Sequence, residues 1–148
     1  MPEAGRAVIQ DELAAGGSAL PWSDPGAFAE KMLERDIASW EAARALDGPV
    51  IFDRGIPDIV GYLRLTGIRA PVHLMQSIAD RRYNKRVFIA PPWREIFTQD
   101  AERKQNFAEA EATYQAMRET YTELGYELVD LPCASIEERA AFVRAAII

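Results

Sequence analysis

This chain contains three short apolar runs, and a stretch with helical periodicity separates each run from the next. The runs cover residues 50–53, 86–90 and 126–131, and Gly or Pro residues bound each of them. None is joined to the next by a hairpin signal such as Asn-Gly or Asp-Gly. Short strands that alternate with helices pair mostly in parallel, so the sequence predicts an α/β fold with a mostly parallel sheet.

The helical stretches begin and end at recognisable residues. Asp24 is predicted to cap a helix whose first residue is Pro25. Ser135, with Glu138 three residues on, forms a capping box for the last helix. The other helices are expected to end at Gly, Pro or a polar turn. The expected helices cover residues 4–15, 25–46, 57–65, 71–82, 99–124 and a final stretch after Ser135.

Length and charge exclude several classes of protein. The chain has 148 residues, so we expect residues 1–148 to form a single domain. A net charge of −6 argues against a general nucleic-acid or membrane-surface binder, which would usually be basic. The N-terminus has no apolar signal-peptide core, and no stretch approaches the roughly 18 apolar residues of a membrane span. We therefore expect a cytoplasmic protein with neither nucleic acid nor membrane as a partner. Assembly into a homo-oligomer is compatible with these observations.

Histidine and cysteine usage limits the available chemistry. Cys133 is the only cysteine and His73 the only histidine. One cysteine cannot form an internal disulfide or a thiolate metal site. One histidine excludes most zinc sites and most histidine-based catalytic mechanisms. We expect both residues to be packing residues, and we expect Trp22, Trp40 and Trp93 to lie in the core or at its rim.

The first candidate site follows the expected strand at 50–53. Ligands of parallel sheets bind at the carboxyl ends of the strands. There Asp53 could hold a magnesium-bound water or accept a substrate proton, and Arg54 could bind a phosphate bidentately. The alternative is that Asp53 only caps the following helix and that Arg54 is solvated. Asp53 is thus a candidate catalytic and metal-binding residue, Arg54 a catalytic one and Asp58 a substrate-binding one.

The second candidate site follows the expected strand at 86–90. Arg94 and Arg103 bracket a segment that could fold over a ligand. Two arginines on such a flap suit the neutralisation of phosphate charge during transfer, which makes both of them catalytic candidates. The alternative is an ordinary charged helix start, with Asp100 as its N-cap and Arg103 paired locally.

Two further charged groups have open interpretations. Glu3 and Arg6 lie one helical turn apart, so they could bind a substrate or simply pair with each other. A basic patch before residue 86 could be a solvated turn or could face an anionic partner. The patch consists of Arg81, Arg82, Lys85 and Arg86.

Three segments together resemble a known family. They are PEAGR at 2–6, VIFDRGIPD at 50–58 and RRYNKRVFIAPPWREIFTQDAERKQNF at 81–107. They resemble the predicted-ATPase family of AAA-type P-loop proteins, in a domain group that also includes nicotinamide riboside kinase-like modules. The resemblance covers nearly the whole chain, and the third segment is its most specific part. It implies a three-layer P-loop NTPase-like fold, with a parallel sheet flanked by helices, that uses ATP or GTP together with Mg²⁺.

The resemblance also implies roles for the candidate residues. The segment at Asp53 resembles a Walker B strand followed by Asp-Arg, as in small-molecule kinases. The segment from Arg94 to Arg103 resembles the lid of such enzymes. Glu3 and Arg6 resemble residues on the acceptor side. The partners implied are a nucleotide and a small-molecule phosphoryl acceptor.

The chain departs from this family at its start. Such proteins open with a strand and a G-x-x-x-x-G-K-[ST] loop that cradles the nucleotide phosphates, and these residues contain no such motif. We expect the first strand, the P-loop and the first helix, about 30 residues, to be missing, through either a start codon assigned too late or a true truncation. We expect the chain as given to bind ATP poorly. We also expect the strands at 50–53 and 86–90 to pair directly, unless another chain covers the gap between them.

Two classes of function follow. The first is an ATP- or GTP-dependent phosphotransferase or NTPase that acts on a small molecule and is complete only with the missing segment. The second is a non-catalytic interaction or regulatory domain that has kept the scaffold. The coding sequence upstream of Met1 distinguishes them, because an in-frame Gly-rich lysine motif would support the first class.

Overall fold

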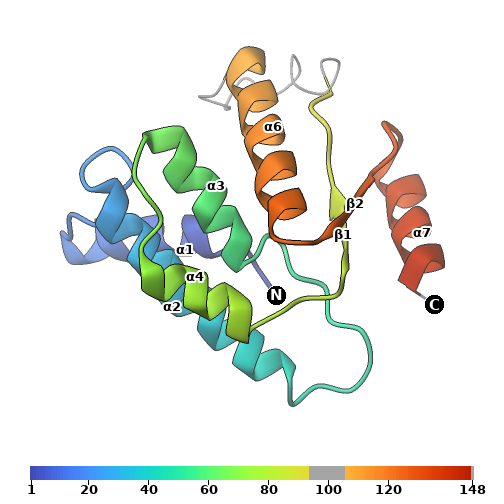
Figure 1. Cartoon of the computed structure of the whole chain (residues 1–148), viewed down its shortest axis with the longest axis horizontal. Coiled ribbons are helices and arrows are strands. Elements are labelled where there is room, and N and C mark those ends of the chain that lie inside the picture. The colour runs from blue at the N-terminus through green and yellow to red at the C-terminus, as the bar shows by residue number, and fades with distance from the viewer. Residues whose placement is uncertain (94–105, 148) are drawn as a thin grey trace. The chain divides into compact units, whose positions relative to one another are not determined.

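A computed structural model of the chain describes residues 1–93 and 106–147. The chain divides into two compact units, residues 1–83 and residues 84–148. The first unit consists of helices, and the described part of the second combines helices with a small parallel sheet (Figure 1). The expected mixture of helices with parallel strands is therefore confirmed.

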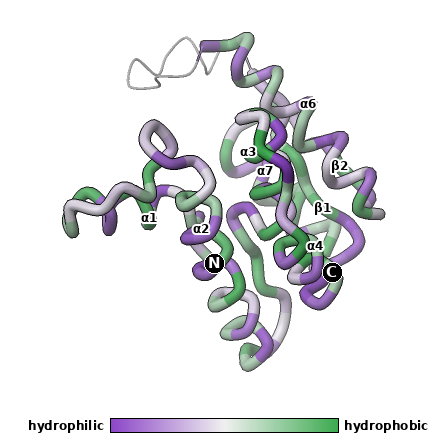
Figure 2. Tube along the Cα trace, turned by 60° about the vertical axis from the view of Figure 1, so that its left-hand side comes forward, coloured by the Kyte–Doolittle hydropathy of each residue, from purple (hydrophilic) through white to green (hydrophobic). Residues whose placement is uncertain are grey.

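The first unit is built from four helices. They are α1 (Ala4–Ala15), α2 (Pro25–Ala43), α3 (Ile56–Thr66) and α4 (Val72–Asp80). Helix α2 packs against α1 and α3, and α3 packs against α4. Figure 2 shows hydrophobic and hydrophilic residues alternating along α2, as expected of a helix with one buried face. The core of the unit is formed by Val8, Phe28, Leu33, Ile56, Ile59, Leu63, Leu74 and Ile78.

Local signals account for the ends of these helices. The Asp24 side chain accepts a hydrogen bond of 3.0 Å from the backbone of Ala27, which confirms it as the N-cap of α2. Helix α2 ends at Ala43, three residues before the expected end. There the amides of Ala45 and Leu46 donate to carbonyls only three residues back, so the last turn is tighter than an α-helix.

The expected strand at 50–53 is wrong, because no residue in this range forms a strand. Instead the Met1 amine donates to the carbonyl of Ile51 at 2.6 Å, and the amide of Asp53 donates to the carbonyl of Met1 at 2.9 Å. These two hydrogen bonds have the pattern of a parallel strand pair. Met1 is a single residue, however, and cannot extend the pair into a ladder. Ile51 is 61 % exposed, so the segment is not a buried strand either.

The second unit contains β1 (Arg86–Ile89), α6 (Phe107–Glu123), β2 (Glu127–Asp130) and α7 (Ile136–Ile147). The two strands pair in parallel, with Arg86 opposite Glu127 and Ile89 opposite Asp130. Their carboxyl ends therefore lie side by side. Both strands were expected, whereas the expected pairing of 86–90 with 50–53 is wrong within the described residues, where β1 pairs only with β2.

The helices of the second unit begin at capping residues. Asn106 accepts a hydrogen bond of 2.8 Å from the amide of Glu109 and caps α6, while the expected earlier start near residue 99 lies outside the described residues. Ser135 and Glu138 form the expected capping box of α7, with hydrogen bonds of 2.9 and 3.2 Å. Across the part of the chain that is described, every helix is too short or too polar to span a bilayer.

Three residues expected to pack are exposed, so that prediction is wrong for them. His73 lies at the surface because its ring nitrogen has a polar partner there, the carboxylate of Glu30 at 2.7 Å. Cys133 lies in the exposed loop that follows β2. Trp22 is 64 % exposed, whereas Trp40 and Trp93 are partly buried, as expected of rim residues.

Candidate functional site

Arg54 lies in the loop that leads into α3, and its backbone is in the left-handed region with φ of 66°. This conformation is uncommon for a residue that has a side chain, and such residues concentrate at functional sites. The guanidinium lies between two carboxylates. Its Nε is 3.6 Å from Oε1 of Glu3, and Nη1 is 3.9 Å from Oδ1 of Asp58. We call Glu3, Arg54 and Asp58 the Arg54 cluster, and it brings together three residues that the sequence singled out.

Asp58 is held in place by the start of α3. Its second carboxylate oxygen accepts a hydrogen bond of 3.0 Å from the amide of Gly55, the N-cap residue of the helix. The amide of Asp58 donates to the Gly55 carbonyl, also at 3.0 Å. A carboxylate in the first turn of a helix is favoured by the positive end of the helix dipole. Asp58 is therefore fixed in the position from which it faces Arg54.

Tyr83 packs against the same loop. Its hydroxyl accepts a hydrogen bond of 3.1 Å from the amide of Ile56. A Cβ atom at Gly55 would lie only 2.9 Å from Cζ of the Tyr83 ring, so only glycine fits there without a shift. The ring of Phe52 meets the Tyr83 ring edge to face, with centroids 5.1 Å apart. Packing thus fixes the residues on both sides of Arg54.

Asp36 is a fourth residue of this region, and sequence reasoning missed it. Its side chain lies on α2 and is only 8 % exposed. Burial is the largest cause that raises the pKa of Asp36 to about 7, and the negative charges of Asp58 and Glu3 raise it further. One signal was visible in the sequence. Asp36 follows Phe28 and Met32 at intervals of four, which places a carboxylate on the apolar face of the helix.

The remaining sequence candidates of this region are placed as follows. Asp53 is exposed and its amide bonds to Met1, whereas Gly55 is the N-cap of α3, so the alternative that Asp53 caps this helix is wrong. Arg6 is exposed on α1, and the ion pair of Glu3 is made with Arg54. Arg94 and Arg103 lie outside the described residues. Within residues 1–93 and 106–147, no three Asp, Glu, His or Cys side chains are grouped to hold a metal ion.

A second polar cluster lies at the carboxyl end of β2. Nη1 of Arg118 lies 2.9 and 3.1 Å from the two carboxylate oxygens of Asp130, and the Tyr114 hydroxyl donates to the same carboxylate. The hydrogen bond from Tyr114 is the largest cause that lowers the pKa of Asp130 below its usual value. These contacts connect α6 to the strand. Sequence reasoning missed the cluster, although Asp130 ends an apolar run as Asp53 does.

The basic patch before β1 is engaged in local contacts. Arg81 pairs with Glu41 at 3.2 Å, and Lys85 pairs with Glu127 at 2.7 Å. Arg86 donates to a backbone carbonyl of α7. These contacts favour the interpretation of the patch as a solvated turn over an anion-binding surface.

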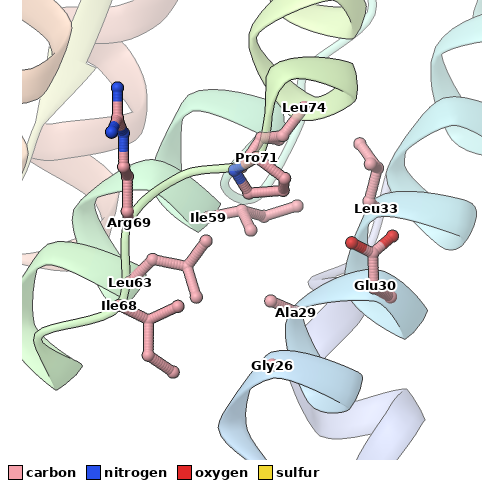
Figure 3. Close-up of a pocket in the computed structure, with 10 residues that line it drawn as sticks. All are labelled: Gly26, Ala29, Glu30, Leu33, Ile59, Leu63, Ile68, Arg69, Pro71 and Leu74. Atoms are coloured by element: carbon pink, nitrogen blue, oxygen red, sulfur yellow. The ribbon is translucent and has the colours of Figure 1, made fainter.

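An apolar groove with a volume of about 250 Å³ lies between α2 on one side and α3 and α4 on the other (Figure 3). Glu30 and Arg69 are the charged residues of its lining. The carboxylate of Glu30 is bound by His73. The groove shares no residue with the Arg54 cluster. Its apolar lining is formed by Gly26, Ala29, Leu33, Ile59, Leu63, Ile68, Pro71 and Leu74.

Comparison with known proteins connects the chain to one family. A family model described as an AAA domain matches residues 1–139. No curated protein and no solved structure gave a significant match. The matched range includes every candidate residue of the Arg54 cluster, Asp36 and the cluster at Asp130.

Proposed function

Because the chain belongs to the AAA domain family of P-loop proteins, we propose that it functions as an ATP- or GTP-dependent phosphotransferase or NTPase that acts on a small molecule. The observation that carries the proposal is the convergence of Glu3, Arg54 and Asp58 at the start of α3. One half-exposed guanidinium between two carboxylates can change partners when a phosphate arrives. We propose the three-layer arrangement of P-loop proteins as the complete fold.

Each residue of the site has a proposed role. Arg54 binds the transferred phosphate, because a guanidinium matches phosphate oxygens bidentately. Glu3 and Asp58, with Arg6, bind the polar groups of the acceptor. Asp53 accepts the acceptor's proton or holds a magnesium-bound water. Arg94 and Arg103, which lie outside the described residues, stabilise the charge that moves during transfer.

The residues present fit part of a nucleotide site. Magnesium in P-loop proteins is held by one or two carboxylates together with phosphate oxygens and water. Asp53 meets that requirement, because its side chain is exposed and makes no ion pair within the described residues. When bound, the metal would neutralise phosphate charge. The 148 residues contain no Gly-rich lysine loop of the kind that cradles nucleotide phosphates.

An assay on the full-length gene product tests this proposal. ATP or GTP would be supplied with a panel of small hydroxyl compounds, and nucleoside diphosphate and phosphorylated product would be measured. We expect Asp53→Asn to abolish turnover, and Arg94→Ala and Arg103→Ala to lower it by about 10²–10³. Near-normal activity of Asp53→Asn would show that this residue has no catalytic role. Absence of any nucleotide turnover in the wild type would favour the non-catalytic interaction domain.

A further inference from the structure

The apolar groove between α2, α3 and α4 has no part in the proposed mechanism. Its volume is about 250 Å³, and the residues that line it lie between Gly26 and Leu74, within the first unit. A cavity of about 150 Å³ lined by aliphatic side chains is large enough to hold benzene. The groove therefore has room for one ring, or a branched aliphatic group, with a short chain attached to it.

The walls of the groove are apolar and are fixed by the core. Leu33, Ile59 and Leu74 line the groove and belong to the buried core of the first unit. Ile68 and Pro71 are partly exposed, so apolar surface of the groove is also open to a ligand. Sites for small molecules are usually preformed in this way, with an apolar lining and a small number of polar groups that set the orientation of the ligand.

The two charged side chains of the lining are oriented differently. Figure 3 shows one oxygen of the Glu30 carboxylate directed from α2 toward the opposite wall, whereas the Arg69 side chain does not turn toward α2. Nε2 of His73 lies 2.7 and 2.9 Å from the two oxygens of Glu30, and this contact orients the carboxylate. A carboxylate has about four lone-pair sites, so Glu30 can accept a further hydrogen bond from a ligand.

We propose that this groove binds a small amine, whose apolar body fills the groove and whose ammonium group donates a hydrogen bond to Glu30. An ammonium group combines three donors with a positive charge, which complements a carboxylate at the edge of an apolar surface. The groove and the Arg54 cluster have no residue in common. The amine site is therefore additional to the site of the proposed phosphoryl transfer.

The charge of the ligand decides how tightly it binds. A carboxylate in the same place would face Glu30 with a like charge, and the net charge of −6 would repel it further. An alcohol of the same shape keeps the apolar contacts but loses the attraction between opposite charges. We therefore expect the amine to bind most tightly, the alcohol less tightly and the carboxylate least tightly. A groove governed by Arg69 would give the reverse order.

Three probes of nearly the same shape test this order, namely 2-phenylethylamine, 2-phenylethanol and phenylacetate. NMR titration of the 148-residue chain would follow its methyl resonances at about pH 7.5 and constant ionic strength. The methyl groups of Ile59, Leu63 and Leu74 should shift, while those of Leu128 in the second unit should not. A ligand of about nine non-hydrogen atoms should bind with a Kd of about 1 mM as the amine and about 10 mM as the alcohol.

Substitution of Glu30 tests the polar half of the site. Glu30→Gln should lower the affinity for the amine about tenfold and leave the affinity for the alcohol nearly unchanged. Glu34→Gln is the matched control, because Glu34 lies one turn along α2, outside the groove lining, and pairs with Lys31 at 3.7 Å. The side chains of Glu30 and Glu34 are 48 and 69 % exposed, so both variants should fold.

Substitution of Ile68 tests the apolar half of the site. Ile68→Ser should lower the affinities for the amine and the alcohol by the same factor, about threefold or more, because both probes lose the same apolar contact. Val72→Ser is the control, since Val72 is 85 % exposed and lies outside the groove lining. It should leave both affinities unchanged.

Three results would overturn the inference. They are binding of phenylacetate as tight as that of the amine, equal affinity of the amine for the wild type and Glu30→Gln, and no amine-induced shift at the groove methyl groups up to about 20 mM. The titrations use neither nucleotide nor phosphoryl acceptor. Their outcome is therefore independent of the assay that tests the proposed function, and either proposal can fail while the other stands.

Discussion

The Arg54 guanidinium lies 3.6 Å from the carboxylate of Glu3, so an ion pair joins the loop before α3 to the residue that precedes α1. Asp58 faces the same guanidinium from the first turn of α3. This relationship joins two sequence motifs that lie far apart in the chain. Arg54, which lies at the centre of the proposed site, also has a left-handed backbone.

The stability of the protein should depend on Asp36 in a defined pH window. The folded state raises the pKa of Asp36 from 3.8 to about 7, so it binds this proton more tightly than the unfolded state does. The stability that this proton contributes is complete below about pH 4 and falls by about 1.4 kcal/mol per pH unit until about pH 7. Asp36→Asn should remove this slope and be more stable than the wild type at about pH 8.

Urea unfolding at several pH values checks this prediction. Asp47→Asn is the matched control, since Asp47 is exposed and should leave the slope unchanged. If Asp36→Asn kept the wild-type slope between about pH 4 and pH 7, Asp36 would not be the group responsible.

Glycine should be required at position 55. Gly55→Ala places a Cβ atom 2.9 Å from the Tyr83 ring, and we expect it to lower the free energy of unfolding by about 1–3 kcal/mol. Gly26→Ala is the control, because its Cβ would meet nothing closer than 3.6 Å within α2. There alanine should be neutral or stabilising by up to about 1 kcal/mol. Equal effects of the two substitutions on chemical unfolding would contradict this packing.

The left-handed backbone at Arg54 should be detectable as strain. Arg54→Gly and Arg54→Ala remove the same ion pairs, but only glycine adopts φ of 66° freely. We therefore expect the glycine variant to be more stable than the alanine variant by about 1 kcal/mol, which thermal unfolding of the two variants would measure. An alanine variant as stable as the glycine variant would indicate that the loop relaxes without cost.

The 148-residue chain should bind ATP weakly. It contains no loop of backbone amides and lysine to hold the phosphates, so the triphosphate charge would rest on scattered arginines. Isothermal titration should detect no binding in the micromolar range. Micromolar affinity would show that these residues hold a nucleotide by another arrangement.

Local signals were enough to predict most of the helices. Asp24 and Ser135 cap helices through contacts within three residues, and such contacts are written in the sequence. The segment at 50–53 was predicted wrongly, because a strand needs a neighbour and, among the residues that the structure describes, Met1 alone pairs with it. The apolar run at 50–53 could not by itself show that the neighbouring strand is missing from the described part of the chain.

The candidate site was predictable in part for similar reasons. The residue types and spacing at Asp53–Asp58 and at Glu3 pointed to two motifs, and tertiary packing brought Glu3 to Arg54. Asp36 could not be identified with equal ease, since its pKa depends on burial and on two carboxylates from other elements. His73 was expected to be buried, but its ring lies at the surface, where it pairs with the carboxylate of Glu30.

The most direct test of the account is the turnover of Arg54→Gln in the full-length gene product, measured as ATP-dependent phosphorylation of an acceptor. Arg44→Gln is the matched control, because Arg44 pairs with Glu41 and stacks on Trp40 at the far end of α2, away from the Arg54 cluster. The account predicts that Arg54→Gln lowers kcat/KM by about 10²-fold or more, while Arg44→Gln leaves it unchanged. Wild-type kcat/KM in Arg54→Gln would contradict the assignment of this cluster as the phosphate-contacting site.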